Sequence, residues 1–148
     1  MVSHVFLWLL AGCLILSPVK ASQKDVEKET VVDVSSYSHV SGYLSAYDKN
    51  PTVYTIEYRQ STGEIPHDLS GYDGVITVLD CGRIGQEAIL AIGEKTIKTI
   101  VFDCAGQSDG GYAWMVENNI VAEVGWGIAQ KHPEIVHKKA TVIYGGGN

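Results

Sequence analysis

The chain has 148 residues, of which 17 are acidic and 11 basic, giving a formal net charge of −6, and 45% of its residues are hydrophobic. This length predicts one domain with a single core. The acidic balance argues against nucleic acid and anionic membranes as partners.

The N-terminus contains an uninterrupted apolar run from Val5 to Leu16, with small residues at Val19 and Ala21. The run is shorter than the roughly 20 residues that a membrane-spanning helix needs. Small residues at the −3 and −1 positions predict cleavage after Ala21. We therefore expect residues 1–21 to be a signal peptide and the protein to be secreted and extracellular. An uncleaved signal anchor is the alternative, because the segment before the run lacks Lys and Arg.

Cleavage would remove Cys13 and leave two cysteines, Cys81 and Cys104. An even number of cysteines in an oxidising compartment predicts one disulfide. A redox pair or a metal site would need a C-x-x-C spacing or further ligands. We expect a structural disulfide, no metal and no cofactor.

The first half of the chain predicts a leader followed by strands. Residues 22–36 are expected to be a mobile leader, and residues 37–145 the folded domain. Apolar and small polar residues alternate from Val31 to Asp48, as in a strand with one wet face. Strict alternation over Val53–Arg59 predicts another strand, and glycines and a proline make residues 63–74 a loop.

Three apolar runs rich in Val, Ile and Thr follow, at Val75–Leu79, Ala88–Ile92 and Thr96–Phe102. They are typical of strands on a half-buried surface. Gly93-Glu94 lies where a two-residue hairpin needs a positive φ.

The C-terminal part predicts one clear helix over Trp114–Lys131, with Trp114 and Trp126 at helical spacing and therefore expected in the core. Ala140–Tyr144 predicts a last strand, and residues 146–148 a tail. Six short strands around one late helix favour a small closed barrel or two paired sheets.

The order of these elements, with Cys81-Gly82 at one strand end and Val101–Cys104 (VFDC) at another, resembles the double-psi β-barrel superfamily of barwin, expansin and RlpA-like proteins. The likeness extends over residues 72–144, and more loosely over 42–59. The chain is also similar to small secreted proteins of ascomycete fungi. The resemblance implies a mainly β fold, a six-stranded double-psi β-barrel with one α-helix before the last strand.

The resemblance also implies a site. In that superfamily an open groove binds polysaccharide, and the aspartate of a V-x-D-x-C motif lines it, which implies this role for Asp103. Related glycoside hydrolases carry a second aspartate just before the helix. The matching segment here has no carboxylate, and the nearest candidates are Asp109 and Glu117. Asp80 is a further candidate partner for Asp103 in catalysis, since hydrolysis usually needs two carboxylates; turn capping is the alternative role for both aspartates.

Candidate ligand-binding residues lie beside glycines or at loop ends: Tyr43, Tyr47, Asp109 and Tyr112. Flat aromatic faces suit sugars, although tyrosine is also an ordinary strand residue. His132 and His137 flank Pro133 in a segment that is more typical of a solvated loop than of a metal site.

The leading hypothesis is a secreted, monomeric expansin-like or barwin-like barrel that binds cell-wall carbohydrate, or a similar hydroxyl-rich ligand, without hydrolysing it. A weak glycosidase or lytic transglycosylase using Asp103 with a second carboxylate is the alternative. A third possibility is a small-molecule-binding accessory or cyclase-like protein of a fungal secondary-metabolite pathway.

Overall fold

The protein is described by a computed structural model that covers residues 39–106 and 110–145. The predicted signal peptide, the predicted leader, Asp109 and the predicted tail lie outside the described residues. Within the described part, no helix is both long and apolar enough to cross a membrane.

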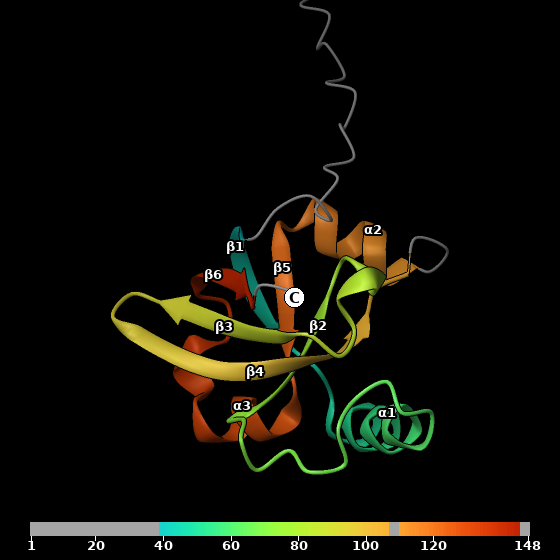
Figure 1. Cartoon of the computed structure of the whole chain (residues 1–148). Coiled ribbons are helices and arrows are strands. Elements are labelled where there is room, and N and C mark those ends of the chain that lie inside the picture. The colour runs from blue at the N-terminus through green and yellow to red at the C-terminus, as the bar shows by residue number, and fades with distance from the viewer. Residues whose placement is uncertain (1–38, 107–109, 146–148) are drawn as a thin grey trace, which may run out of the picture. The chain divides into compact units, whose positions relative to one another are not determined.

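Six strands form a closed barrel (Figure 1). They are β1 (His39–Ala46), β2 (Gly74–Val78), β3 (Glu87–Ile92), β4 (Lys95–Cys104), β5 (Ile120–Val124) and β6 (Lys139–Tyr144). Their order around the barrel is β1-β5-β2-β4-β3-β6. The pairs β1–β5 and β2–β4 are parallel, and the other neighbours are antiparallel. The predicted mainly β barrel of six strands is confirmed.

Helices lie between the strands at several points, so the prediction of a single helix is wrong. The α-helices are α1 (Lys49–Ser61), α2 (Gly110–Glu117) and α3 (Trp126–Lys131). Two short 3₁₀ turns, η2 (Cys81–Arg83) and η3 (Pro133–Ile135), follow β2 and α3.

The strand predicted over 53–59 is part of α1. Pro51 lies in the first turn of this helix, where the missing N–H costs no intrahelical bond. Thr52 is buried and Ile56 packs on an apolar cluster outside the barrel. The buried side of α1 thus follows a spacing of about four residues, and this packing overrides the local alternation.

The helix predicted over 114–131 is three elements: α2, β5 and α3. Asn119 has a φ of 53° and ends the helical path after α2. The following IVAEV segment becomes β5, which pairs with both β1 and β2 and so closes the barrel. Gly125 then donates its N–H to the Val75 carbonyl before α3 begins. The strand conformation of this segment therefore depends on its pairing with β1 and β2, which are distant in the sequence.

The central strands and their turn follow the prediction closely. β3 and β4 pair from Glu87 to Ile100 across the Gly93-Glu94 turn, and Gly93 has a φ of 59°. The three predicted central strands and the last strand are confirmed, with small shifts at their ends.

The barrel interior is apolar and densely filled. Its fully buried side chains include Leu44, Ile76, Val78, Leu90, Val101, Ala122, Val124 and Val142. Successive side chains of a strand point to opposite faces. The residues between these core positions therefore point to the outer face, where a second cluster of Ile65, Val75, Ile100 and Phe102 packs with Ile56 of α1.

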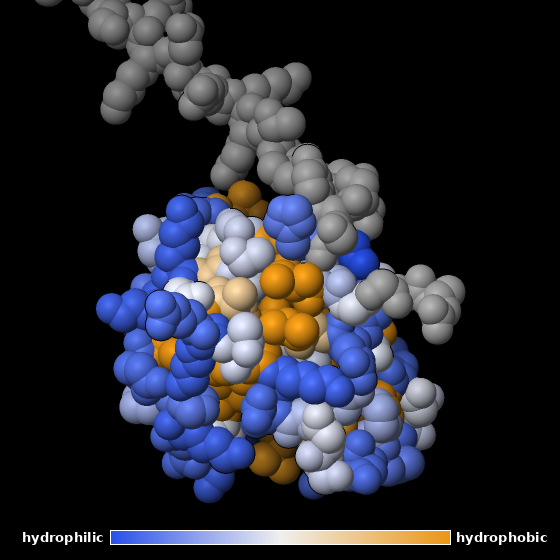
Figure 2. All heavy atoms as spheres, turned by 60° about the vertical axis from the view of Figure 1, so that its left-hand side comes forward, coloured by the Kyte–Doolittle hydropathy of each residue, from blue (hydrophilic) through white to orange (hydrophobic). Residues whose placement is uncertain are grey.

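Figure 2 brings the side of the β3–β4 hairpin forward and shows apolar residues gathered among hydrophilic ones. On the neighbouring strands β3 and β6, Ile89 and Ile143 are direct partners and both are exposed. Apolar atoms make up more than half of an ordinary protein surface. The patch alone therefore assigns no function.

Candidate functional site

Four polar side chains lie in register on four neighbouring strands, and we call them the carboxylate row: Ser45, Glu123, Thr77 and Asp103. Ser45 pairs with Glu123, Glu123 with Thr77, and Thr77 with Asp103. A register shift in the β2–β4 pair brings Asp103 to this position. Directly paired residues point to the same face. The row therefore crosses the outer face of β1, β5, β2 and β4.

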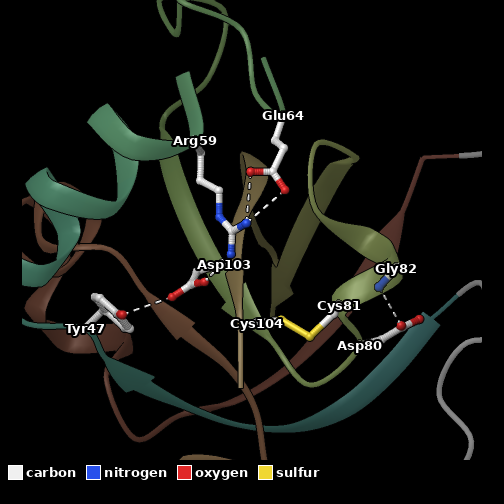
Figure 3. The surroundings of a disulfide bond; sticks show 8 residues. All are labelled: Tyr47, Arg59, Glu64, Asp80, Cys81, Gly82, Asp103 and Cys104. Carbon is white, nitrogen blue, oxygen red and sulfur yellow. Dashed lines mark hydrogen bonds and ion pairs between the residues drawn. A yellow bond between two sulfur atoms is a disulfide. The ribbon is translucent and has the colours of Figure 1, made fainter. Parts of the chain in front are cut away.

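Asp103 is held by two donors from the segment after β1 (Figure 3). The Tyr47 hydroxyl donates to Oδ2 at 3.0 Å, and Arg59 Nη2 donates to Oδ1 at 3.0 Å. Arg59 Nη1 also donates to both carboxylate oxygens of Glu64, at 2.9 and 3.0 Å. The resemblance implies that Asp103 lines a groove. In the structure its carboxylate contacts the Arg59 guanidinium and the Tyr47 hydroxyl. None of its described hydrogen bonds caps the turn that follows β4.

Glu123 is a half-buried acidic residue of the row. Burial raises its pKa, and the negative charges of Asp103 and Asp48 raise it further. The hydrogen bond that the Ser45 hydroxyl donates to Oε1, at 3.0 Å, offsets part of this effect. Glu123 therefore keeps its proton to a higher pH than an ordinary glutamate.

Tyr47 responds to the same surroundings. Burial, together with the charge of Asp103, raises the pKa of Tyr47 to about 12. Its hydroxyl thus remains a hydrogen-bond donor over the physiological pH range. Tyr47 was predicted to bind ligand, and the structure places its hydroxyl on the Asp103 carboxylate.

Two buried polar atoms near the row have no hydrogen-bond partner among the described residues. They are Thr77 Oγ1 and Arg59 Nε. Thr77 is only 2% exposed and lies in register between Glu123 and Asp103. Buried polar groups are nearly always paired, so these two atoms are exceptions, and both are shielded from solvent.

A groove of about 310 Å³ opens beside Tyr43, in the middle of β1, and we call it the aromatic groove. It is lined by Tyr43, Trp114, Asn118, Ile120 and His137. Tyr43 is 44% exposed and Trp114 45% exposed. The expectation that Trp114 packs in the core is therefore wrong, because α2 ends at Glu117 and its outer side faces solvent.

The groove and the row lie on one face of the barrel. Tyr43 and Ser45 are two residues apart on β1 and point away from the buried Leu44, so their backbones are about 7 Å apart. Tyr112, a further predicted ligand residue, is half-buried against the cluster that contains Met115 and Ile120. It packs beside the groove without being one of its lining residues.

Asp80 belongs to a separate arrangement. The predicted disulfide between Cys81 and Cys104 is present, and Figure 3 shows Asp80 and Asp103 on either side of it. The Gly82 N–H donates to Asp80 Oδ1 at 2.9 Å, which caps η2. Asp80 thus makes the turn contact that was the alternative prediction, and Glu123 is the carboxylate that shares a row with Asp103.

Sequence reasoning missed several residues of this region: Arg59, Trp114 as a surface residue, Asn118, Glu123, and His137 as a groove residue. Glu123 had a signal, since it is the one charged residue in IVAEV. Arg59 had none, because only the packing of α1 brings it to β4. In the part of the chain that the structure describes, no group of three His, Cys, Asp or Glu side chains could hold a metal ion.

Comparison of the chain with protein-family models, with curated proteins and with solved structures finds no match. The arrangement of the site itself is thus the basis for a functional proposal.

Proposed function

We propose that this protein is a secreted, carbohydrate-binding barrel of the double-psi type, and that a neutral polysaccharide lies in the aromatic groove. The observation that carries the proposal is the pair Tyr43 and Trp114, two large aromatic side chains nearly half exposed in one groove. Aromatic rings offer a flat apolar face with a polar edge, which suits the CH face and the hydroxyls of a sugar ring. Asn118 and His137 add hydrogen-bonding groups beside them.

The double-psi assignment is supported by the barrel's connectivity. Two parallel pairs, β1–β5 and β2–β4, interrupt an otherwise antiparallel barrel of six strands. Cys81-Gly82 begins η2, which two residues separate from the end of β2 at Val78, and Asp103-Cys104 ends β4. These are the strand-end positions that the superfamily resemblance implies.

Charge and redox state support the location and the class of ligand. A disulfide suits an oxidising compartment. A net charge of −6 disfavours polyanionic glycans by repulsion. Neutral wall polymers, such as glucans and chitin, are the ligand class that fits. A small apolar ligand would favour a pocket without the polar Asn118 and His137, so the accessory or cyclase-like role is less well supported.

The test is retention on insoluble chitin, cellulose, β-glucan and peptidoglycan by the oxidised protein recovered from a secreting host. Trp114→Ala and Tyr43→Ala should each weaken binding by roughly 3- to 10-fold, the range expected for loss of one aromatic contact. Tyr54→Ala is the matched control, because Tyr54 is 71% exposed on α1, away from the groove lining. Wild-type protein that none of the polymers retains, or groove variants that bind like wild type, would contradict the proposal.

A further inference from the structure

We infer that His137 is the specificity-determining residue of the aromatic groove, and that its imidazole selects among neutral sugar polymers by hydrogen bonding. This role rests on the proposed carbohydrate binding. It goes beyond that binding, because stacking on Tyr43 and Trp114 needs only the apolar face of a sugar ring, which these polymers share.

His137 occupies a backbone position that normally belongs to glycine. Val136 has a φ of −60° and a ψ of 131°, His137 has a φ of 67°, and the Lys138 N–H donates to the Ile135 carbonyl at 2.9 Å. These values match a type II turn with His137 as its third residue, where a positive φ is required and glycine or asparagine is the usual choice. In the described part of the chain, the other non-glycine residue with a positive φ is Asn119, which ends α2 in the way that asparagine commonly ends helices.

The turn is needed for the barrel, whatever side chain it carries. The His137 N–H donates to the Leu44 carbonyl at 2.8 Å, and the Leu44 N–H donates to the Lys138 carbonyl at 3.0 Å. Both bonds join backbone groups, and they hold the turn on β1 just before β6 begins at Lys139. Glycine at position 137 would make the same bonds without strain. Strained non-glycine residues cluster at binding sites, where the side chain has a function that the fold does not require.

The His137 side chain is exposed and lines the aromatic groove. Within the described residues its imidazole makes no hydrogen bond or ion pair. Asn118, another polar lining residue, donates its Nδ2 to the Trp114 carbonyl at 2.8 Å, so part of its amide holds the end of α2. A neutral imidazole has one nitrogen that donates and one that accepts. His137 therefore brings both a donor and an acceptor to the groove.

A polar group of this kind distinguishes one sugar from another. Ligand sites gain affinity from apolar and aromatic contacts, and specificity from a few polar groups at fixed positions. Neutral polymers differ in the orientation and substitution of their hydroxyls; chitin, for instance, has an acetamido group where cellulose has a hydroxyl. A polymer that satisfies the imidazole is favoured over one that covers it without a hydrogen bond. The backbone bonds to Leu44 fix the position of the turn, as such selection requires.

The first measurement is the urea midpoint of the oxidised protein, which needs no ligand. His137→Asn should raise the midpoint by roughly 0.3 M, because asparagine accepts a positive φ more readily than histidine. His67→Asn is the matched control, since His67 is exposed in the loop after α1, and it should leave the midpoint unchanged. A lower midpoint for His137→Asn would show that the imidazole stabilises the fold, and would overturn the inference.

The second measurement is the ratio of bound to free protein on insoluble chitin, cellulose, β-glucan and peptidoglycan. On the polymer that wild type prefers, His137→Asn and His137→Gly should weaken retention by roughly 3- to 10-fold, the loss expected for one hydrogen bond. Retention on the other polymers should change much less, so the preference narrows. Trp114→Ala should weaken retention on every polymer by a similar factor, because stacking is common to them. His67→Asn should bind like wild type.

The outcomes separate the role of His137 from the proposed function. Retention of wild type on no polymer would overturn both. Retention that Trp114→Ala weakens but His137→Asn leaves unchanged would overturn the role of His137 and leave the binding proposal intact. The same conclusion would follow if His137→Asn weakened retention equally on every polymer, or if wild type showed no preference among the polymers.

Discussion

Arg59 of α1 and Asp103 of β4 form an ion pair across 44 residues of sequence, with Nη2 donating to Oδ1 at 3.0 Å and both side chains only 18% exposed. The same guanidinium holds Glu64 in the loop after α1. One side chain thus fixes the helix, the loop and the carboxylate row relative to one another.

Replacing Arg59 by Met should destabilise the fold by about 2 kcal/mol, because the half-buried Asp103 carboxylate loses a charge-assisted hydrogen bond. Urea unfolding gives the free energy of unfolding directly. Arg59→Lys keeps the charge but cannot bind both carboxylates through a planar fork, so it should recover only part of the loss. An Arg59→Met protein with an unchanged urea midpoint would show that solvent screens this pair completely.

The disulfide between Cys81 and Cys104 closes a loop with a sequence separation of 23 and joins η2 to the end of β4. In the loop-entropy model such a link stabilises the folded state by about 3 kcal/mol. The double variant Cys81→Ala/Cys104→Ala should lose about that much free energy of unfolding, measured in urea without reductant. Reduced wild type should lose a similar amount. A loss well below 1 kcal/mol in both would mean that the entropy model does not describe this loop.

Gly42 lies where β1 approaches β5 closely. A Cβ at this position would come within 2.5 Å of the Asn119 carbonyl oxygen and of Val121 Cγ1. Gly42→Ala should therefore shift β1 from β5 and cost about 2 kcal/mol, as read from thermal or urea unfolding. Gly71→Ala is the control, since a Cβ there meets nothing within 4 Å, and it should change stability by less than about 0.5 kcal/mol. Equal stabilities for the two variants would refute the close approach.

The stability of the protein should depend on pH through Glu123 in a definite direction. Its folded pKa is raised, chiefly by burial, so its contribution to stability is present below the ordinary glutamate value of 4.5 and is lost as the pH rises through the folded pKa. Glu123→Gln, which cannot ionise, should therefore be more stable than wild type at pH 7, and the difference should vanish at pH 3 to 4. Urea unfolding of both proteins between pH 3 and pH 7 measures this difference in stability.

Glu87→Gln should change the stability at pH 7 in the opposite direction to Glu123→Gln. Hydrogen bonding from the Tyr72 hydroxyl, with the charge of Lys98, lowers the pKa of Glu87. Its contribution to stability is present above the ordinary value and is lost as the pH falls, so Glu87→Gln should be less stable than wild type at pH 7. The same sign for both variants would contradict the environments described for the two glutamates.

The sequence by itself determined the features that depend on neighbouring residues. The β2, β3, β4 and β6 runs are apolar and β-branched over their own length, and the Gly93-Glu94 turn follows from a local demand for positive φ. The disulfide followed from the two cysteines, Cys81 and Cys104, that remain outside the predicted signal peptide. These local signals predicted a mainly β fold and left a closed barrel as one of two possible architectures.

Only the tertiary structure decided between helix and strand where the local pattern suited both. Residues 53–59 alternate like a strand, yet they form part of α1, because Ile56 packs on the cluster that contains Phe102 and Arg59 pairs with Asp103 of β4. The segment after Asn119 has helical spacing, yet it forms β5 because β1 and β2 each need a neighbour to satisfy their backbone hydrogen bonds. Glu123 joins Asp103 for the same reason. Its place in the carboxylate row is set by strand register, and register is a property of the closed barrel that no short stretch of sequence contains.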